Sequence, residues 1–314
     1  MGWTAYRLVY QAKSPIHIGW HTLGYIKLTR YYITGKAMWG AMTANIARIM
    51  NLDKPLQDHY KDIGNTLMNK YIFASYFYPA LDHKKPLHPC FTDRGLIYGS
   101  LHTPDPSQEG NYTLDKFERL FIKSYGQTAV MPDTNTAEDE TLHESEFISS
   151  MVYEKDEQKP VYFVGYVFIN DETKYDNSPI KWKNIKGAVS EIFVGADRKY
   201  GWGRLLLDEG KTGEVTDSMV FGNTLYSDDK DLKIEIKKGD LIPAHLSISS
   251  DIKMKGDIEP LVGREWGEVT DKDGKTHKGF GQMVSKAEIC WVPGSIIEEE
   301  NPLTFRIGAY GILE

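Results

Sequence analysis

The sequence predicts an α+β protein with two domains. Three observations carry this expectation: the order strand, helix, inserted segment, strand, helix, strand over the first two-thirds; an uninterrupted apolar run at 161–169; and a strand-rich final third. Strands and helices in that order form an antiparallel sheet with helices on one face. We place the first domain at 1–215, with an insertion at about 51–160, and a β-rich domain at 216–314.

The N-terminal elements are a strand and a helix. Residues 3–11 read as a strand, broken by Ser14-Pro15 and followed by the short extension 16–19. Residues 20–34 form a connection rich in Tyr and Thr. From Thr34 onward, apolar residues recur at helical spacing, at Ala37, Met38, Ala41, Met42, Ile46 and Ile49. Gly35 and Gly40 are unusual in a helix and suggest that other backbone approaches it closely.

The segment 51–160 reads as an elaboration of the first domain. A helix is expected at roughly 55–73, and Thr113 opens another with acidic residues in its first turn. Nine acidic residues lie between Asp133 and Glu157, which predicts a mobile, solvated loop.

The elements after the insertion complete the expected sheet. The run 161–169 has the composition of a central buried strand, 180–192 reads as a helix and 204–207 as a strand. Their order is compatible with a ferredoxin-like unit. In the final third, 232–237 and 246–252 alternate as strands do, and Asp273-Gly274 indicates a hairpin turn.

Charge is distributed unevenly along the chain. The net charge is -7, yet residues 1–52 contain no Asp or Glu and carry +6, which leaves -13 elsewhere. This asymmetry predicts a surface that faces a polyanion, or else a buried segment with basic residues at its rim. Only Cys90 and Cys290 are present, so a disulfide scaffold and a cysteine zinc site are excluded and the cytoplasm is expected. No residue spacing predicts a cofactor, a metal site or a membrane span.

The most informative motif is the glycine-rich segment from Gly195 to Gly203. It combines three glycines with Arg198 and Lys199, and Arg204 follows directly. Cations and glycine N–H groups suit phosphates, and Tyr200 or Trp202 offers a face for a base. The alternative is a loop whose glycines serve only a sharp turn.

His17 and His21 lie four residues apart near the end of the first strand. They could be a general acid and base for RNA cleavage, or an ordinary strand-end and loop histidine. Because no carboxylate is near them in sequence, the second interpretation is favoured.

Two segments resemble one family. The segments 14–19 and 32–42 are similar to the N-terminal pattern of the RAMP superfamily of CRISPR proteins, in which a Pro/Gly strand end precedes a Tyr-Ile-x-Gly helix start. The segment 193–205 looks like that superfamily's glycine-rich loop. The resemblance covers about 50 residues and implies a ferredoxin-like, RRM-related core that binds CRISPR RNA (crRNA) in a type III effector complex.

Departures from the family pattern narrow the expectation. Residues 1–52 lack the Asp of target-cutting backbone subunits, and 111 residues follow Gly203, unlike processing endonucleases. The chain is most similar to the Csm/Csx-type subunit that caps the crRNA 5′ tag, with 216–314 a β-rich domain that could be a degenerate RAMP domain. The resemblance implies RAMP backbone subunits and the large polymerase-like subunit as partners, in the cytoplasm of a prokaryote.

We therefore expect a non-catalytic crRNA-binding subunit that serves antiviral defence. The alternatives are a metal-independent endoribonuclease that processes precursor crRNA through His17 or His21, and a purely structural subunit of the same type of complex. The residues expected to bind RNA are Gly35, Lys36, Trp39, Gly195, Arg198, Lys199, Tyr200, Gly201, Trp202, Gly203 and Arg204.

Overall fold

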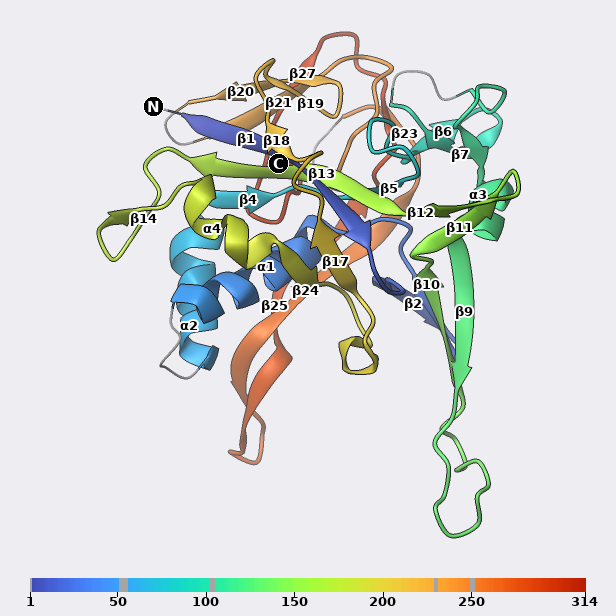
Figure 1. Ribbon diagram of the computed structural model, residues 1–314. Helices are drawn as coiled ribbons and strands as arrows, with labels where there is room; N and C mark the ends of the chain where they lie inside the picture. The colour runs from blue at the N-terminus through green and yellow to red at the C-terminus, as the bar shows by residue number, and fades with distance from the viewer. Residues whose placement is uncertain (1, 51–55, 102–104, 229–230, 249–251) are drawn as a thin grey trace.

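The computed structural model describes residues 2–50, 56–101, 105–228, 231–248 and 252–314 (Figure 1). Within these residues strand outweighs helix, and the strands fall into several sheets. The expected strand-rich α+β class is confirmed. None of the helices in the described segments is both long and apolar enough to cross a membrane.

One antiparallel sheet forms the centre of the molecule. Its main path runs β16-β17-β1-β13-β4, and β18 and β5 add to β1 and β13. The strands are β1 (Trp3–Ala12), β4 (Ile72–Ala74), β5 (Tyr78–Ala80), β13 (Tyr162–Asn170), β16 (Glu191–Phe193), β17 (Arg204–Leu207) and β18 (Gly213–Glu214). β1 and β13 pair along their length, from Trp3 opposite Asn170 to Gln11 opposite Tyr162.

Helices cover one face of this sheet. They are α1 (Gly35–Met50), α2 (Leu56–Ile63), which continues as the π-helical turn Gly64–Met68, and α4 (Trp182–Val189). The apolar positions of α1, including Met38, Met42 and Ile46, pack in one core with Leu8 and Tyr10 of β1. The helix expected at 55–73 ends early, because Ile72 begins a sheet strand; residue 55 lies outside the described residues.

The C-terminal strands cover the opposite face. Trp3 and Phe168 of the sheet share a second core with Leu232, Ile234 and Ile236. Burial on both faces explains why the segment around β13 is apolar throughout. The strands are β19 (Met219–Val220), β20 (Asn223–Ser227), β21 (Leu232–Ile236), β22 (Leu246–Ser247), β23 (Met254–Lys255), β24 (Ile258–Thr270), β25 (Thr276–Trp291), β26 (Ile296–Ile297) and β27 (Leu303–Arg306). Of the strand expected at 246–252, only the start forms; residues 249–251 lie outside the described residues.

The segment 51–160 is not one inserted body. β4 and β5 belong to the central sheet, because both pair with β13. The remainder builds smaller sheets around α3 (Leu114–Phe121), whose N-cap is Thr113, as expected. Their strands are β6 (His88–Thr92), β7 (Gly95–Gly99), β8 (Tyr112–Thr113), β9 (Ile122–Gln127), β10 (His143–Ile148), β11 (Met151–Glu154) and β12 (Glu157–Pro160).

The prediction of a mobile acidic loop is wrong for much of the acidic tract. β10 pairs with β9 over six residues and with β3 (Ile26–Thr29), which in turn pairs with β2 (Gly19–Leu23). Ser145 and Ile148 of β10 are fully buried, and its two acidic residues, Glu144 and Glu146, are half-buried in an ordered strand. The acidic composition of the segment gave no sign of this strand pairing.

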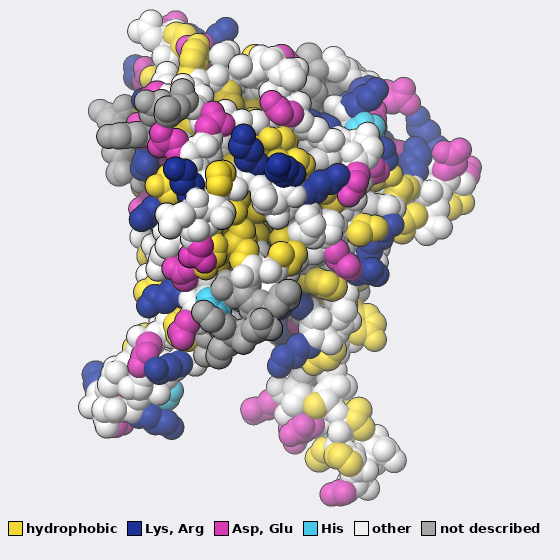
Figure 2. Space-filling model, turned by 60° about the vertical axis from the view of Figure 1, so that its left-hand side comes forward, with side chains coloured by type: hydrophobic (Ala, Val, Ile, Leu, Met, Phe, Trp, Pro, Cys, Tyr) yellow, Lys and Arg dark blue, Asp and Glu magenta, His cyan; other side chains and the backbone are white. Residues whose placement is uncertain are grey.

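Two hairpins project from the same side of the molecule. We call them the β9–β10 arm and the β24–β25 arm; Figure 1 shows the loop between β16 and β17 lying between them. In Figure 2 they are separate projections below the body, with a hollow between them. The β24–β25 arm contains the turn expected at Asp273-Gly274.

Candidate nucleic-acid interface

The glycine loop, residues 194–204, is fixed to the end of β1. Gly195 and Gly203 have positive φ, and a Cβ on Gly195 would lie 2.1 Å from the carbonyl oxygen of His17. The N–H of Ala196 donates to that same oxygen (3.0 Å), and the N–H of Gly203 donates to the Pro15 carbonyl (2.7 Å). Glycine is needed here for both conformation and close approach.

Most backbone N–H groups of the glycine loop are engaged within this chain. The N–H groups of Ala196, Tyr200, Gly201 and Gly203 all bond to carbonyls of this chain, so the expected backbone contact with phosphate is not available from them. Arg198 and Lys199 are exposed and form no ion pair within the described residues. Arg204 is exposed but is held 2.6 Å from Glu191.

Of the two aromatic residues in the loop, Tyr200 is the accessible one. Its side chain is 70% exposed, whereas Trp202 is only 8% exposed. Trp202 packs edge-on against Phe147 of β10, with ring centroids 4.9 Å apart. The expectation that Trp202 stacks a base is therefore corrected: it anchors the loop to the β9–β10 arm.

Gly35, Lys36 and Trp39, which the sequence predicts as RNA-binding residues, lie at a covered helix end and not on an open surface. A Cβ on Gly35 would lie 2.1 Å from the Tyr310 carbonyl oxygen, so the C-terminal segment covers this helix end. Lys36 is bound to Glu265 of β24, and its Nζ lies 4.0 Å and 4.1 Å from the ring centres of Trp39 and Tyr310. Trp39 is 2% exposed. The ion pair between Lys36 and Glu265 thus connects α1 to the β24–β25 arm.

Burial governs the charge of Lys36. Desolvation lowers the pKa of its ammonium group to about 8, although Glu265 acts in the opposite direction. A carboxylate already neutralises this lysine, so it adds little positive field for RNA.

β2 supplies exposed aromatic surface that the sequence did not reveal. All five of its residues are exposed, and Trp20 and the adjacent Tyr25 expose about half of their side chains. The expectation for 20–34 was only a connection. The available signal was a segment rich in aromatic residues and free of acids.

The histidine pair is not assembled as an acid–base pair. The Nδ1 of His17 lies 2.6 Å from the Glu146 carbonyl oxygen, and the side chain is 4% exposed. His21 is exposed and packs against the Trp20 ring. No hydrogen bond joins the two histidines in the described part of the chain.

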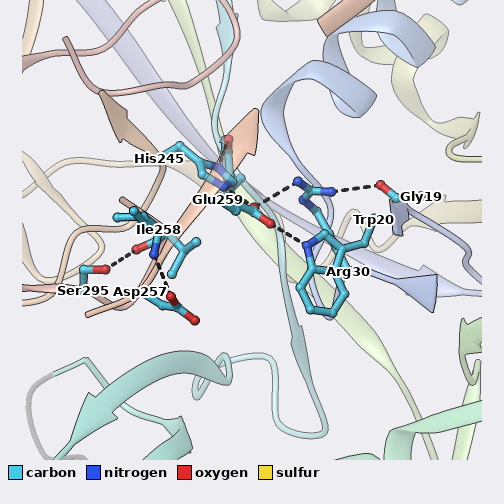
Figure 3. Close-up of polar contacts among 10 residues, drawn as sticks. Gly19, Trp20, Arg30, His245, Asp257, Ile258, Glu259 and Ser295 are labelled. Atoms are coloured by element: carbon cyan, nitrogen blue, oxygen red, sulfur yellow. Dashed lines mark hydrogen bonds and ion pairs between the residues drawn. The ribbon is translucent and has the colours of Figure 1, made fainter. Parts of the chain in front are cut away.

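A buried polar network ties β2 and β3 to the C-terminal strands (Figure 3). The carboxylate of Glu259 accepts hydrogen bonds from Trp20 Nε1 (2.5 Å) and from the guanidinium of Arg30 (2.9 Å). It also lies 2.5 Å from Nε2 of His245, whose Nδ1 contacts the Tyr76 hydroxyl at 2.7 Å. Arg30 and Glu259 are 229 residues apart, so local spacing gives no sign of the pair.

The network is internally neutralised. Burial alone would raise the pKa of Glu259, but the hydrogen bond from His245 and the charge of Arg30 outweigh it and lower the pKa. Burial lowers the pKa of His245, against the opposing effect of Glu259. A neutral imidazole that donates to Glu259 and accepts from Tyr76 satisfies both ring nitrogens of His245, while Arg30 balances the carboxylate.

The described residues contain no group of three or more His, Cys, Asp or Glu side chains placed to hold a metal ion. The glycine loop presents Arg198, Lys199 and Tyr200 as exposed side chains between the arms. Cations next to exposed rings are the usual composition of a single-stranded nucleic-acid site.

Comparison with known proteins gives a fold and no family by sequence. No family model matches the chain, and no curated protein matches it. A chain in the cryo-EM structure of the type III-B Cmr-beta complex bound to cognate target RNA and AMPPnP is similar over 93% of this chain and 85% of its own, with a TM-score of 0.51 and 11% identity. A second structure of that complex with target RNA gives a TM-score of 0.47 at 10% identity, covering 93% and 86%. At these identities the likeness is one of fold.

Proposed function

We propose that this protein is a non-catalytic crRNA-binding subunit of a type III CRISPR-Cas complex, in which it holds the crRNA 5′ tag. The observation that carries the proposal is the glycine loop. It holds two exposed cations that form no ion pair with any described residue, and an exposed tyrosine, on a backbone pinned to the end of the central sheet. The shared fold with a chain of an RNA-bound type III-B complex supports the same assignment. We also propose that the central sheet is a ferredoxin-like RAMP unit, since its strand order and antiparallel pairing fit that topology.

In the proposed mechanism, the subunit acts by placement. The tag backbone lies in the hollow between the arms, where Arg198 and Lys199 neutralise phosphates and Tyr200 stacks on a base. Because the loop is fixed by backbone hydrogen bonds, the bound tag has one register, and base pairing by the guide then reads the target. The arms and the C-terminal strands are available to partner subunits.

No observation favours the endoribonuclease alternative. A general base must reach the proton that it removes, and His17 is buried with Nδ1 already engaged. His21 is exposed, but no carboxylate among the described residues pairs with its ring to orient it. The protein-only alternative differs from the proposal in its dependence on salt, because phosphate contacts weaken steeply with salt whereas packed protein contacts do not.

The test is a binding measurement on RNA in EDTA, read on native and denaturing gels. The RNAs are a crRNA with its 5′ tag, the full repeat and a scrambled sequence. We expect a tag-dependent shift with intact RNA. A discrete cut in the repeat would instead support the endoribonuclease.

The variant Arg198→Ala with Lys199→Ala should weaken binding of every RNA and flatten the slope of log affinity against log salt by about 1.4, the value for two lost phosphate contacts on a single strand. Lys183→Ala with Lys237→Ala is the control, because it removes the same charge from two exposed lysines away from the loop. Unchanged affinity and slope in the loop variant would refute the assignment of the glycine loop.

A further inference from the structure

A second basic site lies on the sheet face opposite α1 and α4. Here Arg7 of β1 and Tyr166 of β13 form the floor of a cavity of about 210 Å³, with Lys84, Lys85 and His88 on its wall. Phe221, from the turn between β19 and β20, closes another side. None of the residues that line this cavity is Asp or Glu, in a protein with a net charge of -7.

Arg7 is the feature that points to a ligand. Its guanidinium donates to the carbonyl oxygen of His83 and is bonded to the Tyr166 side chain, and both partners are neutral. The residue is partly buried and forms no ion pair with a carboxylate within the described residues. A buried or partly buried charge normally has a counter-ion, so the missing partner is an anion.

The neighbouring charges strengthen this positive field. Desolvation lowers the pKa of His83, and Lys211, Arg7 and Lys84 lower it further against the opposing effect of Asp82. Asp82 is the acid nearest to Lys84 and Lys85 in sequence, and its carboxylate is engaged by the N–H of Lys84 (2.9 Å) and by His83 (3.6 Å). Neither Asp82 nor Asp217, whose charge acts on Tyr166, is among the residues that line the cavity.

We propose that this cavity binds a nucleotide phosphate. A guanidinium and two ammonium groups around one small space are the donor set that phosphate prefers. The apolar side, formed by Tyr166 and Phe221 with ring centroids 4.8 Å apart, suits the sugar or base that carries the phosphate. The volume is below the range of about 300–1,000 Å³ that is typical of drug-sized ligands, so the cavity encloses only part of one nucleotide and does not hold an extended strand.

This site goes beyond the proposed tag-binding function. It does not include the glycine loop, and its residues come from β1, β13, the segments 84–88 and 100–101, and the β19–β20 turn. The phosphate could belong to a free mononucleotide or to the end of an RNA, and the experiment below separates the two.

The test is isothermal titration calorimetry of the full chain with AMP, inorganic phosphate, and a dinucleotide with either a 5′-phosphate or a 5′-hydroxyl. We expect saturable binding of AMP at one site. Lys84→Gln with Lys85→Gln should weaken it by at least about tenfold, the loss expected for two charge-assisted contacts. Lys183→Gln with Lys237→Gln should stay within about twofold, since it removes the same charge elsewhere. The lysine variants leave Arg7 and its structural hydrogen bonds intact.

Tighter binding of the 5′-phosphorylated dinucleotide than of AMP would identify an RNA end as the source, and the reverse order a free nucleotide; either supports the phosphate site. The absence of saturable binding for all phosphate ligands, or an equal loss in both lysine variants, would overturn it. Arg198→Ala with Lys199→Ala should keep full AMP affinity, so failure of this inference and failure of the tag-binding proposal are separable.

Discussion

At the scale of single residues, ion pairing decides which cations can serve RNA. Lys36 and Lys199 look alike in sequence, since each has glycines close to it in the chain. Lys36 is neutralised by Glu265 and covered by two rings, whereas Lys199 is exposed without an ion-pair partner in the described chain. The number of cations available to RNA is therefore smaller than the number of Lys and Arg residues in the N-terminal segment suggests.

Glu259→Gln should destabilise the protein by about 3–5 kcal/mol. The change leaves Arg30, whose side chain is 10% exposed, without its counter-ion in a buried network. Urea unfolding of the purified chain measures the loss. Glu268→Gln is the matched control: it breaks an exposed pair with Lys278, and its cost should remain below about 1 kcal/mol. Equal costs would show that the Arg30–Glu259 pair is not the structural link that its burial implies.

At the scale of elements, the glycine loop owes its position to backbone packing against residues 13–17, which directly follow β1. Gly195 and Gly201 both have positive φ, but only Gly195 also lies against another segment. A substitution at Gly201 therefore measures backbone strain alone, whereas one at Gly195 measures strain together with a steric clash.

Gly201→Ala should cost about 1–2 kcal/mol, the strain of a left-handed non-glycine residue, because nothing lies within 4 Å of the added Cβ. Gly195→Ala should cost clearly more, since its Cβ would meet the His17 carbonyl, and it should also weaken RNA binding by displacing the loop. Urea unfolding and the RNA gel shift measure both effects. Equal losses of stability would contradict the anchoring of the loop to the end of β1.

At the scale of the whole molecule, two carboxylates join the C-terminal strands to the N-terminal elements. Glu259 binds Arg30 and Trp20, and Glu265 binds Lys36. In both cases burial would raise the pKa of the carboxyl group, but the hydrogen bonds and cations lower it below its ordinary value of 4.5. The contribution of these two carboxylates to the free energy of unfolding therefore depends on pH.

Because the folded-state pKa values are lowered, the stabilisation is fully present above about pH 4.5 and is lost as the pH falls further. We expect the free energy of unfolding, measured by urea titration, to fall with acid below that pH. Glu265→Gln should make this fall less steep, since glutamine does not titrate, and the exposed control Glu268→Gln should follow the wild-type profile. A Glu265→Gln profile as steep as that of the wild type would argue against this link.

Local patterns determined much of the outline. Helical spacing located α1, apolar composition located β13, and the Thr113 cap and the Asp273-Gly274 turn formed where expected, because each depends on residues close in sequence. The glycines at 195 and 203 likewise indicated a backbone with positive φ, which favours glycine.

Long-range contacts decided the rest. β4 and β5 joined the central sheet, Trp202 became a buried anchor, and Lys36 acquired a partner 229 residues away. The cavity around Arg7 draws on five separate segments of the chain. Burial and charge compensation are properties of residues that meet only after folding, so the sequence by itself specified which groups are present, and the tertiary structure decided which of them remain available for a ligand.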